Sequence, residues 1–235
     1  MTTFGTTPVR DRLAVALDVP DLDAAEQLAK EVSPWCGVAK VGLELFSAAG
    51  PEAISRMRAL DLKVFADLKL HDIPTTVGRA ARVLGKLGAQ YVNFHAAGGV
   101  DMLRAAVEGL AEGAADANHP SPLPIAVTVL TSDPDASQFD ARLAAAIESG
   151  CRGVVCSAHE VARVHDARRD FVTIVPGVRF DDGARHDQAR VGTPETATRA
   201  GADVLVVGRA VTHANDPRAA AERVFDAVTR ALASR

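Results

Sequence analysis

The most constraining feature of this sequence is a regular alternation between short apolar runs and segments of helical period. The apolar residues within each run are continuous rather than alternating, which is typical of parallel strands buried on both faces. Eight such runs, rich in β-branched residues, occur at 13–18, 38–42, 62–69, 90–95, 125–130, 153–157, 171–177 and 203–208.

The segments between the runs carry helix signals. Apolar residues recur at helical spacing, for example at Ala25, Leu28, Ala29 and Val32, which predicts one face packed on the strands. Residues that commonly begin or end helices occur at the expected places. Helix starts are predicted at Pro20-Asp21, Thr193-Pro194-Glu195 and Asp216-Pro217, and helix ends at Gly88, Gly150 and Gly201.

Alternating strands and helices with a parallel sheet allow an open doubly wound sheet or a closed barrel. Eight units favour the barrel, and the first strand is not followed by the G-x-G-x-x-G turn of a dinucleotide-binding fold. We therefore expect one domain over residues 1–235, a single (β/α)8 TIM barrel. Its active site should lie at the carboxyl ends of the strands, with phosphates often bound after the seventh and eighth.

Composition excludes several classes of protein. The chain has 26 Lys+Arg against 30 Asp+Glu, a net charge of −4, which argues against nucleic acid or an anionic membrane as partner. Three cysteines without a repeated spacing are neither a disulfide framework nor a zinc site. We see neither a signal peptide nor an apolar run long enough to span a bilayer, so a cytoplasmic location is expected.

Charged residues interrupt the strands where apolar residues are expected. Asp18 ends the first run, Lys40 lies inside the second, and Asp67 and Lys69 end the third, with Asp72 just beyond. These positions fall at the predicted catalytic face. Unpaired buried charge is costly, so the groups should pair with one another. The alternative is a structural network of ion pairs that closes the barrel without any chemistry.

The pattern also suggests what the charges do. Strand periodicity places Asp67 and Lys69 on one face of their strand, towards the mouth of the barrel. Lys69 between carboxylates should remain a cation, fit to donate a proton rather than to form an imine. A substrate carboxylate placed against Asp67 would be repelled, which favours its loss as CO2.

A second set of residues predicts an anion site at the other side of the barrel mouth. The polar, glycine-containing segment 176–194 follows the seventh run, and it is long enough to predict a mobile lid at about 178–192. Arg179 and Gln188 on it are candidate phosphate donors. After the eighth run, Gly208 and Arg209 stand at a predicted helix start, where backbone N–H groups and a guanidinium can bind an anion.

With these residues assembled, the chain resembles the orotidine 5′-monophosphate decarboxylase family. The sequence DLKLHDIPTTV at 67–77 fits that family's D-x-K-x-x-D-I-P-x-T signature at every fixed position. Further matching stretches occur in the family's order, and they are ALDVP, VAKVGLELF, VNFHAAGG, VTVLTS, PGVR, DQARVGTP and ADVLVVGRAVT.

The resemblance implies a role for each residue. The catalytic set would be Lys69, Asp67, Asp72 and Lys40, with Lys69 protonating C6 of the pyrimidine and Asp67 facing the substrate carboxylate. Asp72 would reach the site of a neighbouring subunit in a homodimer. The substrate-binding set would be Asp18, Lys40, Asp67, Thr76, Thr131, Arg179, Gln188, Gly208 and Arg209. The resemblance implies no metal and no organic cofactor, with UMP as product.

Two rival hypotheses remain at this stage. A sugar-phosphate decarboxylase or aldolase of the same barrel superfamily would share the D-x-K-x-x-D core but need a divalent metal. The I-P-x-T extension and Gln188 argue against that rival, and the histidines show no paired spacing on one helix for a metal. A catalytically silent nucleotide-binding protein would have lost the Asp/Lys array, which is complete here.

Overall fold

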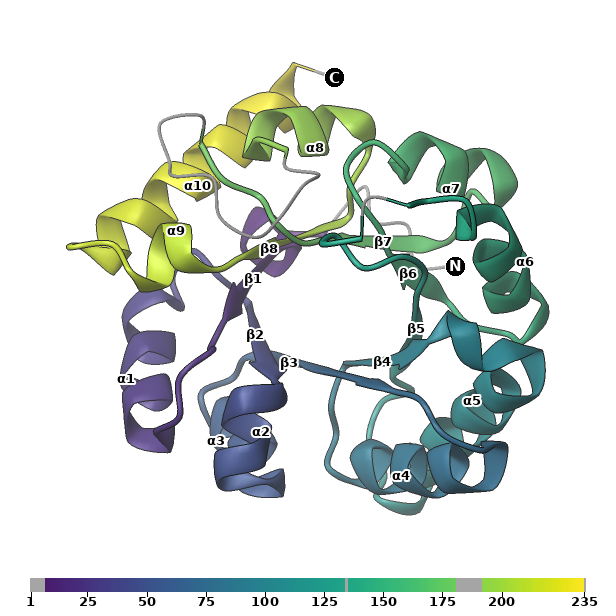
Figure 1. Ribbon diagram of the computed structural model, residues 1–235. Helices are drawn as coiled ribbons and strands as arrows, with labels where there is room; N and C mark the ends of the chain where they lie inside the picture. Colours follow the sequence, from purple (N-terminus) through teal and green to yellow (C-terminus); the bar gives the residue numbers. More distant parts are fainter. Residues whose placement is uncertain (1–6, 134, 181–191, 235) are drawn as a thin grey trace.

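The computed structural model describes residues 7–133, 135–180 and 192–234. Within them, eight parallel strands close into a barrel in sequential order, and Figure 1 shows the ring of strands inside a ring of helices. The strands are β1 (Leu13–Ala16), β2 (Val38–Gly42), β3 (Lys63–Leu70), β4 (Tyr91–His95), β5 (Leu123–Val127), β6 (Gly153–Val155), β7 (Val172–Val175) and β8 (Val204–Val207). The predicted TIM barrel is confirmed, and the open sheet is excluded.

The helices follow the strands around the outside of the barrel. They are α1 (Leu22–Val32), α2 (Leu43–Ala49), α3 (Pro51–Ala59), α4 (Pro74–Lys86), α5 (Gly99–Asp116), α6 (Phe139–Glu148), α7 (Val161–Ala167), α8 (Pro194–Ala200), α9 (Arg209–Thr212) and α10 (Pro217–Ala233), with 3-10 helices η2 (Val9–Arg12) and η3 (Ala96–Gly98). Among the residues placed in the structure, no helix combines the length and the apolar character needed to cross a bilayer.

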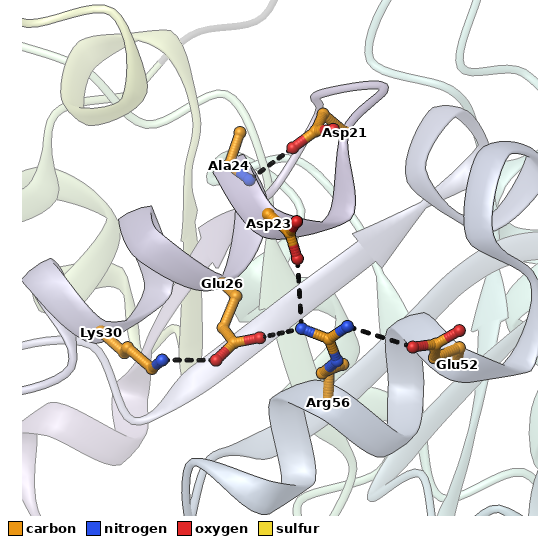
Figure 2. Close-up of polar contacts among 7 residues, drawn as sticks. All are labelled: Asp21, Asp23, Ala24, Glu26, Lys30, Glu52 and Arg56. Carbon is orange, nitrogen blue, oxygen red and sulfur yellow. Dashed lines mark hydrogen bonds and ion pairs between the residues drawn. The ribbon is translucent and has the colours of Figure 1, made fainter.

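The predicted helix starts are confirmed by side-chain caps. The Asp21 carboxylate accepts a hydrogen bond from Ala24 N at 2.7 Å (Figure 2), and Asp216 caps α10 in the same way. Thr193 and Thr196 form a reciprocal capping box at α8. Each cap satisfies a backbone N–H that has no partner within its helix, which fixes where the helix begins.

Apolar side chains form two separate cores. One lies inside the barrel and includes Phe65 and Tyr91, whose rings meet edge to face with centroids 6.3 Å apart. The other lies between the strands and the helices and includes Val64, Ala66 and Leu68. The strand alternation predicted for β3 is therefore confirmed, and it turns Asp67 to the same side as Phe65.

The amino-terminal end of the barrel holds a buried polar pair. The backbone N–H and hydroxyl of Thr173 both donate to Asp203 Oδ2, at 2.9 and 3.0 Å, and Asp203 N donates back to Thr173 Oγ1 at 3.1 Å. Burial raises the pKa of the Asp203 carboxyl above its ordinary value. Because Thr173 and Asp203 lie at the starts of β7 and β8, this pair is remote from the carboxyl ends of the strands.

An exposed ion-pair cluster joins α1 to α3. Arg56 contacts Asp23 at 3.3 Å and Glu52 at 3.2 Å, and Glu26 pairs with both Arg56 and Lys30, as Figure 2 shows. Exposed ion pairs of this kind contribute little to stability because water screens them. We interpret the cluster as a surface contact between two neighbouring helices.

Glycines allow α4 and α5 to pack backbone to backbone. A Cβ at Gly109 would lie 2.1 Å from the carbonyl oxygen of Gly78, and a Cβ at Gly113 would lie 1.9 Å from that of Arg82. Heavy atoms cannot approach so closely, so these positions accept only glycine unless the helices move apart. The close packing fixes α4, and with it the segment between β3 and α4, against the rest of the barrel.

We predict that Gly109→Ala lowers the free energy of unfolding by ~2–3 kcal/mol, because the added methyl group overpacks the helix contact. A loss of stability would be evidence for the close contact, since in a helix without such a contact alanine is usually more stable than glycine by about 1 kcal/mol. Urea unfolding followed by circular dichroism measures the change. Ala111→Ser, at an exposed position of the same helix, is the control and should cost less than about 0.5 kcal/mol. A Gly109→Ala protein as stable as the parent would contradict the packing argument.

Candidate active site

Parallel strands bring the predicted charged residues to one end of the barrel. Lys40 lies in β2, Asp67 and Lys69 lie near the end of β3, and Asp18 follows β1. Asp18 does not end its strand as the sequence suggested, because β1 stops at Ala16 and Asp18 stands two residues beyond it. It still lies at the carboxyl end, where the loops of a barrel build its site.

The four groups form one alternating chain of charges. Lys40 Nζ lies 2.9 Å from Asp18 Oδ1 and 3.3 Å from Asp67 Oδ2, and Lys69 Nζ lies 2.6 Å from Asp67 Oδ1. The predicted pairing of these charges is therefore confirmed. A Cβ at Gly42 would lie 2.8 Å from Asp18 Oδ1 and 2.9 Å from Lys40 Nζ, so glycine at this position leaves the room that the Asp18–Lys40 pair occupies.

Asp67 is the central anion of this chain. Burial by itself would raise the pKa of Asp67, but the charges of Lys40 and Lys69, together with hydrogen bonds from Lys69 and Asn93, outweigh burial. The net result is a pKa below the ordinary value of 3.8. Asp67 is therefore a carboxylate at neutral pH, with only 14% of its side chain exposed. Lys69 is more accessible, at 33%, and so presents its ammonium group towards the barrel mouth.

Sequence reasoning missed Asn93, which lies on β4 beside the charged chain. Its side chain is fully buried, its Nδ2 donates to Asp67 Oδ1 at 2.7 Å, and its Oδ1 accepts from Lys69 N at 2.7 Å. The available signal was one polar residue in the otherwise apolar run YVNF, on the same strand face as Tyr91.

Asp72 is not joined to the charged chain within this subunit. Within the described structure its carboxylate bonds to the next residue, where Asp72 Oδ1 accepts from Ile73 N at 2.6 Å. Asp72, Ile73 and Thr76 are all exposed, and the Ile73 side chain is among the large apolar groups left open to solvent. The expectation that two carboxylates flank Lys69 is met by only one, Asp67, in this chain.

Other predicted substrate-binding residues follow other strands of the barrel. Thr131, predicted to approach the pyrimidine, follows β5, and Gly208 and Arg209, predicted to bind the anion, follow β8, with Gly208 as the N-cap of α9. Val178 pairs with Gly192 in an isolated parallel bridge, and the N–H of Arg179 donates to the Gly192 carbonyl at 3.1 Å. The two ends of the predicted lid are therefore joined. Gln188 lies outside the described residues.

Two histidines near the end of β4 have structural contacts. His95 Nδ1 accepts a hydrogen bond from Ala97 N at 3.2 Å and so caps η3, and its ring stacks on that of His71 with centroids 5.4 Å apart. Burial, together with nearby cationic groups, lowers the pKa of His95. In the described part of the chain, no group of three or more His, Cys, Asp or Glu side chains could hold a metal ion.

A closed parallel barrel with charged side chains gathered at the carboxyl ends of its strands has the architecture of a TIM-barrel enzyme. Comparison with known proteins identifies the family within this class of enzymes. The sequence model of the orotidine 5′-phosphate decarboxylase / HUMPS family matches residues 11–224, and the chain belongs to this family.

Individual relatives agree with the family match. An orotidine 5′-phosphate decarboxylase of Moorella thermoacetica is 46% identical, over 92% of this chain and 91% of the relative. One from Anaeromyxobacter dehalogenans is 48% identical, over 91% of this chain and 96% of the relative. The crystal structure of the enzyme from Lactobacillus acidophilus superposes with a TM-score of 0.77 at 36% identity, covering 92% of this chain and 98% of that one.

We predict a specific pH signature of Asp67 in the stability of the protein. Because the folded-state pKa of Asp67 lies below 3.8, its contribution is complete above that pH and is lost as the pH falls through the folded-state pKa. The free energy of unfolding of the parent, measured by urea titration, should therefore fall relative to that of Asp67→Asn as the medium is acidified below pH 3.8.

The control for this titration is Asp101→Asn, which removes a carboxylate that is 86% exposed on α5. That variant should track the parent across the same pH range. A difference between the parent and Asp67→Asn that stays constant, or that grows in acid, would show that Asp67 is not held as an anion by its neighbours.

Proposed function

We propose that this protein converts orotidine 5′-monophosphate into UMP and CO2 without a metal or organic cofactor, in the cytoplasm. The observation that carries the proposal is the continuous chain Asp18–Lys40–Asp67–Lys69, which ends in an accessible ammonium group. Decarboxylation of orotidine 5′-phosphate is the activity named for the curated relatives.

The proposed chemistry uses fixed charge where other decarboxylases use an electron sink. The substrate carboxylate lies against Asp67, and the repulsion between the two anions is relieved when the bond from C6 to the carboxyl carbon breaks. CO2 leaves, the electron pair remains on C6, and Lys69 Nζ delivers a proton to that carbon. A preorganised ammonium group can stabilise the developing negative charge with no reorganisation at the moment of reaction.

Lys40 has a supporting role in this proposal. It lies between Asp18 and Asp67 and is itself nearly buried, at 9% exposure. Its charge keeps Asp67 ionised, and its contact with Asp18 holds both groups at the positions where ribose hydroxyls would bind. The proposed ribose and pyrimidine contacts are completed by Thr76 and Thr131.

We assign the phosphate to the opposite side of the barrel mouth. Arg179, Gln188, Gly208 and Arg209 form the proposed phosphate-binding set, with residues about 178–192 acting as a lid. The bridge between Val178 and Gly192 supports this assignment, since it joins the two ends of the segment to each other. Phosphate binding far from C6 can then supply binding energy that closes the site.

We also propose a homodimer in which Asp72 completes the site of the partner subunit. Three exposed apolar side chains, Leu43, Ile73 and Leu130, follow β2, β3 and β5 at the carboxyl end of the barrel, with exposed fractions of 58, 66 and 40%. Exposed apolar side chains that gather into one patch can mark a protein–protein contact. Contact with a second copy would cover them and bring Asp72 to the neighbouring site.

We predict that the purified protein turns over orotidine 5′-monophosphate in the presence of EDTA, measured by the change in pyrimidine absorbance. Lys69→Ala should lower kcat by at least ~10²-fold, the usual contribution of a general acid, with the fold intact by circular dichroism. Lys63→Ala is the matched control, because Lys63 starts the same strand at its opposite end and pairs with Asp11.

Several outcomes would contradict this proposal. Folded protein without turnover would remove the assigned activity. Activity abolished by EDTA and restored by a divalent ion would favour the metal-dependent sugar-phosphate class. Full activity in Lys69→Ala would remove the proton-donor role while leaving the family assignment untouched.

A separate prediction tests the shared site. Lys69→Ala and Asp72→Ala should each be inactive, yet equal mixtures that are unfolded and refolded together should recover about a quarter of parental activity. Random pairing in a two-fold dimer leaves one site in each mixed dimer with both residues intact. Recovery is measured as kcat per site. A mixture as inactive as either variant would show that Asp72 serves its own subunit, and an active Asp72→Ala would show that it serves no site.

A further inference from the structure

A buried amide links the two residues to which the proposed chemistry assigns the central roles. Asn93 on β4 is fully buried, and its side chain bonds to the carboxylate of Asp67 and to the backbone of Lys69, both at 2.7 Å. It is one of few polar groups inside an apolar strand pair, where its neighbour in register on β5 is Ile125. The family signature at 67–77 does not include it.

The orientation of the Asn93 amide is fixed by its partners. The backbone N–H of Lys69 can only donate, so it requires the oxygen Oδ1. The carboxylate of Asp67 can only accept, so it requires the nitrogen Nδ2. Asn93 therefore supplies a donor to Asp67 and an acceptor to Lys69, and the two ends of its amide cannot exchange these roles.

The backbone of Lys69 needs such a restraint. Its φ is +50°, in the left-handed region that residues with a Cβ seldom adopt. At this point the pairing of β3 with β4 is irregular, with the register shifting between Ala66 and Leu70. The hydrogen bond from Lys69 N to Asn93 Oδ1 takes the place of a regular ladder bond and holds the strained residue.

The Asn93 side chain thus restrains both Asp67 and Lys69. Asp67 Oδ1 receives both Lys69 Nζ, at 2.6 Å, and Asn93 Nδ2, while the same amide holds the peptide from which the Lys69 side chain extends. The distance between the carboxylate and the ammonium group is therefore set from both ends. Residual strain of this kind is typical of functional sites, where the surrounding structure over-determines a conformation.

We propose that Asn93 is a positioning residue for this reaction, which holds Lys69 in its left-handed conformation and aims it at the reacting carbon relative to Asp67. The inference rests on the proposed roles of Asp67 and Lys69. Asn93 acts through these two residues. Its loss should consequently affect the chemical step more than substrate binding.

The first test compares Asn93→Ala with Thr173→Val by steady-state kinetics on orotidine 5′-monophosphate. Both variants remove a buried polar group from a barrel strand, but Thr173 lies at the amino-terminal end and bonds only to Asp203 in the described structure. Asn93→Ala should lower kcat by ~10²-fold, the cost of a misplacement of about 1 Å, with KM within about threefold. Thr173→Val should lower the melting temperature and leave kcat unchanged.

The second test uses Asn93→Asp, which keeps the side-chain volume and the acceptor for Lys69 N. It places a second carboxyl group against Asp67 Oδ1, and two carboxyls in contact retain a shared proton to higher pH. Lys40 and Lys69, the charged groups that face Asp67, remain in place. The acidic limb of the kcat profile should shift upward by at least about one pH unit, with activity recovering as the pH rises.

These measurements separate the inference from the proposal beneath it. A kcat within about threefold of the parent in folded Asn93→Ala, or an unmoved acidic limb in Asn93→Asp, overturns the role of Asn93. If the alanine variant does not fold, the pH profile of kcat in Asn93→Asp alone tests the role of Asn93. Lys69→Ala is measured in parallel. If Lys69→Ala is inactive and the Asn93 variants are fully active, the inference about Asn93 is rejected and the proposed function is kept. Activity in Lys69→Ala rejects the proposed role of Lys69 as proton donor, on which the inference rests.

Discussion

A buried carboxylate that must stay ionised is the constraint on which the site depends. Asp67 has little access to water, and burial alone would raise its pKa, but Lys40 and Lys69 on either side, with the hydrogen bonds to the carboxylate, bring the pKa below its ordinary value. Each lysine in turn needs a counter-charge, which Asp18 supplies for Lys40. The four groups share partners, since Lys40 contacts both Asp18 and Asp67 and Asp67 contacts both lysines, so the loss of one charge leaves each neighbour with one partner fewer.

The closed barrel provides the geometry that this assembly requires. Adjacent parallel strands end at one rim, so residues far apart in sequence, such as Lys40 on β2 and Asp67 on β3, become close neighbours there, with Asp67 two residues beyond the register partner of Lys40. The residues that support the charged groups follow no such regular pattern. Gly42 leaves room for one ion pair, Asn93 restrains a left-handed Lys69, and the glycines between α4 and α5 hold the following segment close.

The sequence predicted the features that follow from periodicity and from residue type. All eight strands, the caps at Asp21 and Thr193, and the pairing of Asp67 with Lys69 were anticipated, because apolar runs and buried charges obey simple rules. The positive φ of Lys69 was not, since it depends on irregular pairing with β4. Asn93 was missed for the same reason. Its role arises from a cross-strand contact, which the spacing within one strand does not reveal.

The bridge between Val178 and Gly192 joins the two ends of one long connection beyond β7 to each other. The entropy of closing a loop grows only slowly with its length, so a segment anchored at both ends can lengthen or change composition at small cost to the scaffold. Recognition of the distant end of a ligand can thus diversify independently of the bond-breaking centre. Grafting foreign connections between these two anchor points is accordingly a practical route to altered ligand preference.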